Sequence, residues 1–123
     1  GRELDVHWIH RGGLDPVTGL AQYAGRVKLV HLKDYRIAPF PASALEQLAA
    51  GDMAGFMAAF TGVVQFAEVG QGNLDWKPIV EQAIASGAEY LLVEQDETYG
   101  RDPFESLSIS RDHLVALGYG GLF

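Results

Sequence analysis

Three short apolar runs with helix signals between them constrain the fold of this chain more than any other feature. The runs are residues 3–9 (ELDVHWI), 26–32 (RVKLVHL) and 89–95 (EYLLVEQ). The second and third runs are rich in valine and leucine and alternate little, which is typical of parallel strands covered on both faces. We therefore expect one strand in each run.

Helix signals follow each run. Asp15 and Pro16 begin one predicted helix, because Asp is a good N-cap and Pro is tolerated at the first helical position. Asp102 begins another, with Glu105 three residues later as in a capping box. A third predicted helix lies between the second and third runs, within 73–87.

Alternating strands and helices predict an α/β fold with a parallel sheet and right-handed crossovers. Residues 36–66 form an insertion, with a helix or helix pair over 43–60 that breaks near Gly51 and Asp52. A complete (β/α)8 barrel needs about 250 residues, and this chain has 123. We therefore expect a single domain over residues 1–123 that is a partial (β/α)8 TIM barrel, its three C-terminal βα units. Open sheet edges predict a homo-oligomer or association with the missing barrel half.

Composition narrows the expected partners and compartment. The net charge is −7 and cysteine is absent, so a nucleic-acid partner is disfavoured, and disulfides and thiolate metal sites are excluded. The chain opens without an initiator Met or the basic and apolar regions of a signal peptide, and no apolar run reaches the length of a membrane span. We expect a cytoplasmic protein with no membrane partner.

Side-chain alternation places one polar residue of each strand on the same face of the sheet. Val30 and Leu32 are expected to pack on helices, so His31 points to the opposite face. The same count puts Asp5 and Glu94 on that face, at or near the ends of the other two strands. In barrel enzymes the catalytic residues gather at this end of the strands.

Two carboxylates and an imidazole are costly to bury in one place unless they are paired or bound to a metal. Their oxygen and nitrogen atoms suit Mn²⁺, Mg²⁺, Co²⁺ or Zn²⁺. His31 has an alternative interpretation as a hydrogen-bonded core residue. Asp5 and Glu94 have one as solvent-facing strand ends or helix caps. Three such residues at equivalent positions favour a metal site.

Further polar residues near these strand ends are candidates for substrate contacts. His7 and His10 flank the first site and are candidates for substrate contacts or for ligands in place of a missing one. For His10 a solvated position is the stronger interpretation. Lys33 is a candidate for neutralising a substrate anion, or for pairing with Asp34 or another carboxylate. The stretch 68–72 (EVGQG) either holds a phosphate through backbone N–H groups or forms a tight turn before the next helix.

Four segments together resemble the sugar phosphate isomerase/epimerase family, the xylose isomerase-like TIM barrels. They are LDVHW, KLVHLKD, EVGQGNLDW and LLVEQD, the last followed by GRDPFESLSISRDHL, in the family's order and spacing. The resemblance implies one divalent metal, most often Mn²⁺, held by Asp5, His31, Glu94 and a further Glu upstream of Gly1. It also implies isomerisation, epimerisation or dehydration of a sugar, sugar phosphate or inositol-like polyol through an enediolate, with Glu94 as one of two carboxylates that move the proton.

The expected substrate contacts are His7, Trp8, Lys33 and Glu68. Trp8 stands where many relatives carry a histidine, so the resemblance leaves the substrate class open. Because one implied ligand has no counterpart in this chain, we expect weak activity or none from the isolated chain. Two other functions stay open: a non-catalytic module that self-associates through its sheet edges, and a DNA-repair endonuclease, which the −7 charge and the four histidines disfavour.

Overall fold

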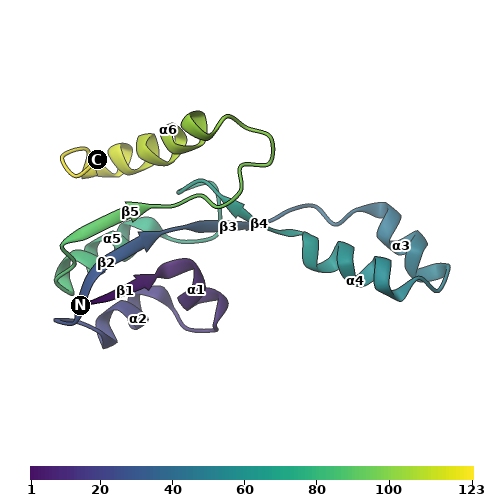
Figure 1. Ribbon diagram of the computed structural model, residues 1–123, viewed down its shortest axis with the longest axis horizontal. Helices are drawn as coiled ribbons and strands as arrows, with labels where there is room; N and C mark the ends of the chain where they lie inside the picture. The colour runs from purple at the N-terminus through teal and green to yellow at the C-terminus, as the bar shows by residue number, and fades with distance from the viewer. The chain divides into compact units, whose positions relative to one another are not determined.

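The computed structural model describes residues 1–123 as a mixed α/β chain with six α-helices (Figure 1). In chain order the elements are β1 (Arg2–Asp5), α1 (Val6–Arg11), α2 (Pro16–Gln22), β2 (Val27–Leu32), β3 (Asp34–Ile37), α3 (Ala42–Ala49), α4 (Met53–Gly62), β4 (Val64–Ala67), α5 (Trp76–Ala85), β5 (Tyr90–Val93), α6 (Pro103–Leu114) and a π-helical turn (Val115–Tyr119). None of these helices combines the length and the apolarity that a membrane crossing requires.

The predicted parallel sheet is confirmed. Its strand order is β1-β2-β5, and β3 pairs separately with β4. Asp5 of β1 lies opposite His31 of β2, and His31 lies opposite Leu92 of β5. The three strands form an open sheet with β1 and β5 at its edges, and no barrel is closed.

The first predicted strand is too long. It ends at Asp5, and the residues that follow form α1. Asp5 Oδ1 accepts hydrogen bonds from the backbone N–H groups of His7, at 2.9 Å, and Trp8, at 3.4 Å. The carboxylate therefore caps α1. Val6, which suggested a continuing strand, enters the core from the helix instead.

Two predicted helix caps are confirmed. Asp15 Oδ2 accepts a hydrogen bond from the backbone N–H of Thr18 at 2.8 Å, and Asp102 Oδ2 accepts one from Glu105 at 3.1 Å. The third helix, α5, begins after Asp75, whose side chain makes no capping hydrogen bond.

The core lies on one face of the three-stranded sheet. Val30 and Leu32 are fully buried there, as predicted, in one apolar cluster with Trp76 of α5. On β5, by contrast, Tyr90 is 63% exposed and Leu92 is 48% exposed. Parallel sheets are normally covered on both faces. The second face of this sheet carries Leu92 beside the polar His31, and it is partly open to solvent.

The chain forms two compact units. The sheet unit comprises Gly1–Tyr35 and Phe66–Phe123, and the hairpin unit comprises Arg36–Gln65. In the hairpin unit α3 and α4 pack against each other across a turn at Gly51, whose φ of +82° favours glycine. The helix pair predicted for the insertion is confirmed. That the whole chain is a single domain stays a prediction.

Candidate functional site

The predicted metal ligands come from neighbouring strand ends. Asp5 is the last residue of β1, His31 is the last but one of β2, and Glu94 directly follows β5. His31 Nδ1 lies 3.2 Å from Glu94 Oε2, and His31 Nε2 lies 3.7 Å from Glu3 Oε2. The parallel register therefore brings an imidazole and a carboxylate into direct contact.

Lys33 forms ion pairs with both Asp5, the third predicted ligand, and Glu94. Its Nζ lies 3.2 Å from Asp5 Oδ2, 3.1 Å from Glu94 Oε2 and 2.8 Å from Asp96 Oδ2. We call Asp5, His31, Lys33, Glu94 and Asp96 the strand-end cluster. Sequence analysis left the partner of Lys33 open between Asp34 and another carboxylate, and the structure selects three other carboxylates.

The ammonium of Lys33 is held charged although its side chain is only 4% exposed. Burial opposes the charge, but the bonds to Asp96, Glu94 and Asp5 outweigh burial and raise the pKa of Lys33 above its ordinary value. Three carboxylates around one ammonium leave a surplus of negative charge in the strand-end cluster. The cluster can therefore accept a further positive charge.

The donor types of the strand-end cluster fit a divalent metal. Two neighbouring ligands of an octahedral ion lie about 3 Å apart, close to the 3.2 Å between His31 Nδ1 and Glu94 Oε2. His31 Nδ1 is buried and makes no hydrogen bond, because its contact with Glu94 lacks hydrogen-bond geometry. The structure contains no group of three His, Asp or Glu side chains arranged to hold one metal ion, however. Lys33 Nζ contacts both Asp5 and Glu94.

An aromatic wall flanks Lys33. Its Nζ lies 5.9 Å from the ring centroid of Trp8 and 5.5 Å from that of Phe66. Trp8 is 54% exposed, so this predicted substrate contact is accessible. The wall continues into His7, whose ring lies 4.5 Å from that of Trp8 and 5.3 Å from that of Phe66.

His7, also predicted at the substrate, is buried. It is 1% exposed, and neither ring nitrogen has a hydrogen-bond partner. Burial lowers the pKa of His7, so its imidazole is neutral at neutral pH. A buried imidazole without partners is costly to keep, because both nitrogens forgo their hydrogen bonds to water.

Asp34 organises the segment after β4, and sequence analysis missed this role. Its carboxylate is fully buried and accepts hydrogen bonds from the backbone N–H groups of Gly70, Gly72 and Leu74 at 3.1 to 3.2 Å. It also accepts one from Trp76 Nε1 at 2.8 Å. One carboxylate thus fixes a loop distant in sequence next to the end of β2.

The glycine-rich stretch 68–72 is a turn, the second of the two predicted alternatives. The N–H groups of Gly70 and Gly72 point at Asp34. A Cβ at Gly72 would lie 2.2 Å from the backbone oxygen of Tyr35, so only glycine fits there. The Asp34 carboxylate therefore accepts the N–H groups of Gly70 and Gly72 that would be needed to bind a phosphate.

Glu68 lies apart from the strand-end cluster in its contacts. It is buried and accepts hydrogen bonds from Arg101 Nη1, at 2.7 Å, and Ser106 Oγ, at 2.9 Å. Burial alone would raise the pKa of Glu68, but its own backbone N–H, Ser106 and Arg101 outweigh burial and lower it. Its contacts anchor the loop to α6, and a substrate contact by Glu68 stays a prediction.

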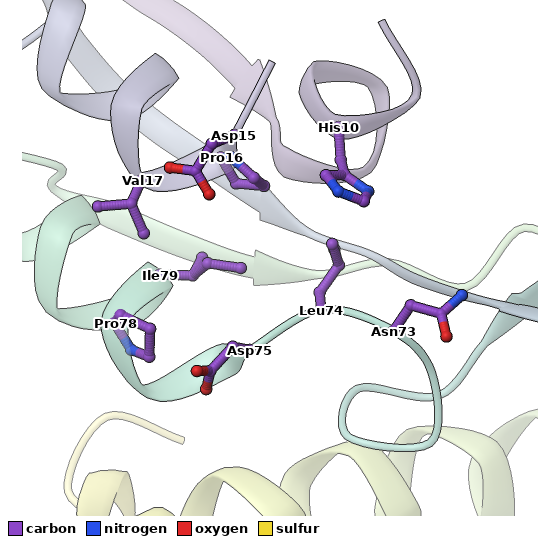
Figure 2. Close-up of a pocket in the computed structure, with 9 residues that line it drawn as sticks. All are labelled: His10, Asp15, Pro16, Val17, Asn73, Leu74, Asp75, Pro78 and Ile79. Atoms are coloured by element: carbon purple, nitrogen blue, oxygen red, sulfur yellow. The ribbon is translucent and has the colours of Figure 1, made fainter. Parts of the chain in front are cut away.

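A separate pocket of about 250 Å³ lies at the N-terminal ends of α2 and α5 (Figure 2). His10 lines it, and so do Asp15, Asn73 and Asp75. Its polar groups are partly engaged: His10 Nδ1 bonds to the Tyr35 hydroxyl at 2.7 Å, and Asp15 caps α2. None of the strand-end cluster lines this pocket.

Comparisons with known proteins give no relative. No family model matches the chain, and no curated protein or solved structure matches it. The strand-end cluster is therefore the main structural indication of function.

Proposed function

We propose that this chain contributes the strand-end cluster to the active site of a divalent-metal-dependent isomerase, epimerase or dehydratase acting on a sugar, sugar phosphate or inositol-like polyol. One observation carries the proposal. His31 Nδ1, buried and without a hydrogen bond, lies 3.2 Å from a carboxylate oxygen of Glu94 at the carboxyl end of a parallel sheet. The resemblance in the sequence supplies the reaction class.

Asp5, His31 and Glu94 would hold the metal. Their mixed oxygen and nitrogen donors suit Mn²⁺, Mg²⁺, Co²⁺ or Zn²⁺, and the resemblance in the sequence favours Mn²⁺ among them. When bound, the metal would polarise neighbouring oxygens of the substrate and so acidify the carbon between them. The surplus negative charge around Lys33 favours entry of such an ion.

Glu94 is one of the two carboxylates that would move the proton. Its carboxylate lies 3.1 Å from Lys33 Nζ and 3.2 Å from His31 Nδ1, and these two contacts hold it in place as a base. Trp8 offers an exposed ring beside Lys33, against which the C–H face of a sugar packs. Lys33 supplies positive charge for an anionic substrate group.

The open face of the sheet supports a partial TIM barrel. Tyr90 and Leu92 are apolar side chains exposed on a parallel sheet, and closing β1 and β5 with further strands would cover them. The remaining strands would complete the site with the second glutamate that the resemblance implies.

A second candidate function is a non-catalytic structural or binding module. The observation that favours it is the position of Lys33, whose ammonium already neutralises part of the charge that a metal would neutralise. In that case the strand-end cluster is an ion-pair network around the buried Lys33 and binds no ion.

A titration with MnCl₂, followed by the EPR signal of free Mn²⁺, separates the two functions. We expect one Mn²⁺ per chain, and at least about tenfold weaker binding in His31→Ala and Glu94→Gln. The matched control is Glu89→Gln, an exposed glutamate paired with Lys28, which should leave binding unchanged. Absence of binding up to about 1 mM, or equal binding in all variants, would overturn the metal-dependent function.

A further inference from the structure

The hairpin unit exposes an apolar helix. The ten residues of α4 (MAGFMAAFTG) include no charged side chain, and none of them is buried. A helix that is apolar on all sides is normally found inside a packed structure. Its exposure therefore indicates that something covers it.

The exposed side chains of α4 are regularly spaced along the helix. Met53, Met57 and Phe60 follow one another at i, i+4 and i+7, so they form one stripe along the helix. They are 57%, 46% and 56% exposed. On α3, Leu45 and Leu48 are spaced by three residues and are also exposed.

The exposed apolar area approaches what one partner of a standard interface buries. We call seven side chains of this unit the hairpin patch: Ile37, Phe40, Leu45, Leu48, Met53, Met57 and Phe60. Each is large and about half exposed, so together they offer on the order of 700 Å². Each partner in a standard protein–protein interface buries about 800 Å².

Charge decides between possible occupants. The hairpin unit contains three charged side chains, Arg36, Glu46 and Asp52, and its one basic residue, Arg36, bonds to Gln65. Anionic lipid surfaces and nucleic acids select basic residues, so neither suits this patch. A second copy of the same uncharged helix meets it without like-charge repulsion, and a two-fold interface requires only self-complementarity.

A groove supplies that complementarity. Small residues at the base of the hairpin, including Ala38, Ala59 and Gly62, line a hollow of about 260 Å³. Met53 lies at the opposite end of α4, next to the turn at Gly51. In an antiparallel pair of hairpins the tip of each one meets the base of the other.

We propose that two copies of this chain associate through the hairpin patch, with α3 and α4 of each copy forming an antiparallel four-helix arrangement and Met53 of each filling the groove of the other. This association is independent of the sheet edges and of the strand-end cluster. It would place two sites in one assembly.

Sedimentation velocity over a range of concentrations tests the association. We expect the chain to sediment as a dimer and Met57→Lys to sediment as a monomer with unchanged circular dichroism. The matched control is Phe104→Lys, which replaces a 79% exposed residue of the sheet unit and should leave the dimer intact. A monomeric wild type, or a dimer that Phe104→Lys but not Met57→Lys dissociates, would overturn the proposal.

A cysteine cross-link gives a second readout that does not depend on mass. The chain has no cysteine, so Met57→Cys introduces a single thiol near the proposed two-fold axis. Mild oxidation should give a covalent dimer from Met57→Cys and much less from Phe104→Cys. Equal cross-linking of the two variants, or binding of the wild type to neutral phosphatidylcholine vesicles as a monomer, would contradict a second copy as the occupant.

Discussion

In the sheet unit a lysine side chain that is only 4% exposed is surrounded by carboxylates, whereas in the hairpin unit a methionine on an uncharged helix is 57% exposed. Charge is buried in one region, and apolar surface is left in water in the other. Both arrangements cost free energy unless the buried charge is paired and the apolar surface is covered. The strand-end cluster has part of its compensation inside the chain, through Lys33. The proposed Mn²⁺ site and the proposed self-association each follow from one side of this contrast.

The largest loss of stability is expected from Asp34→Ala. This change leaves buried donors of Gly70, Leu74 and Trp76 without an acceptor, at a cost of about 4 kcal/mol in the free energy of unfolding. Urea unfolding followed by tryptophan fluorescence measures it. Asp112→Ala, at an exposed position of α6, is the control and should change stability by less than about 0.5 kcal/mol. A similar effect of both variants would show that Asp34 does not organise the loop.

Lys33→Met should cost about 2 kcal/mol at neutral pH, because it leaves Asp5, Glu94 and Asp96 without a cation, although water screens the half-exposed Glu94 and Asp96. The pKa of Lys33 is raised in the folded chain, so its contribution is fully present below its ordinary value of 10.5 and is lost as the pH rises beyond it. The stability gap between wild type and variant should therefore be constant from neutral pH upward and shrink above about pH 10.5. A variant as stable as the wild type would mean that the carboxylates do not need the ammonium.

His7→Phe tests the buried imidazole of the aromatic wall. Because burial lowers the pKa of His7 below its ordinary value of 6.5, the unfolded chain takes up a proton more readily than the folded chain, and stability falls as the pH drops below that value. The stability of the variant should therefore fall less than that of the wild type as the pH drops below about 6.5. Parallel pH profiles would indicate that His7 is protonated equally in both states.

Met57→Lys should have the smallest effect on stability. Its side chain already faces water, so the free energy of unfolding of the monomer should change by less than about 0.5 kcal/mol. Chemical unfolding at low protein concentration measures this value. A loss of several kcal/mol would place Met57 inside the fold of the hairpin and remove the basis for a partner.

Local signals in the sequence predicted much of the architecture. Val30 and Leu32 were predicted to face the helices, and both are buried, so His31 lies on the opposite face as expected. Asp15 and Asp102 were predicted to begin helices, and the structure confirms both caps. The first strand was extended too far because Val6 fits a strand and a buried helix equally well, and the capping role of Asp5 decides between them.

Long-range contacts were beyond a single sequence. Asp34 binds Gly70, Gly72 and Trp76, which lie 36 to 42 residues away along the chain. Alternation along a strand places Lys33 on a face but does not select its partners among several carboxylates. The positions of Asp5, His31 and Glu94 at strand ends were therefore predictable. The helical position of His7 and Trp8 and the ion pairs of Lys33 were not.

The most direct test of the metal-dependent site is a crystal of the chain soaked in MnCl₂, examined by anomalous scattering. The proposed function predicts one strong peak within coordination distance of His31 Nδ1 and Glu94 Oε2. Lys33 Nζ should then be displaced from Glu94 relative to a crystal without Mn²⁺. A map with no peak at the strand ends, and with Lys33 still bound to Asp5 and Glu94, would contradict it.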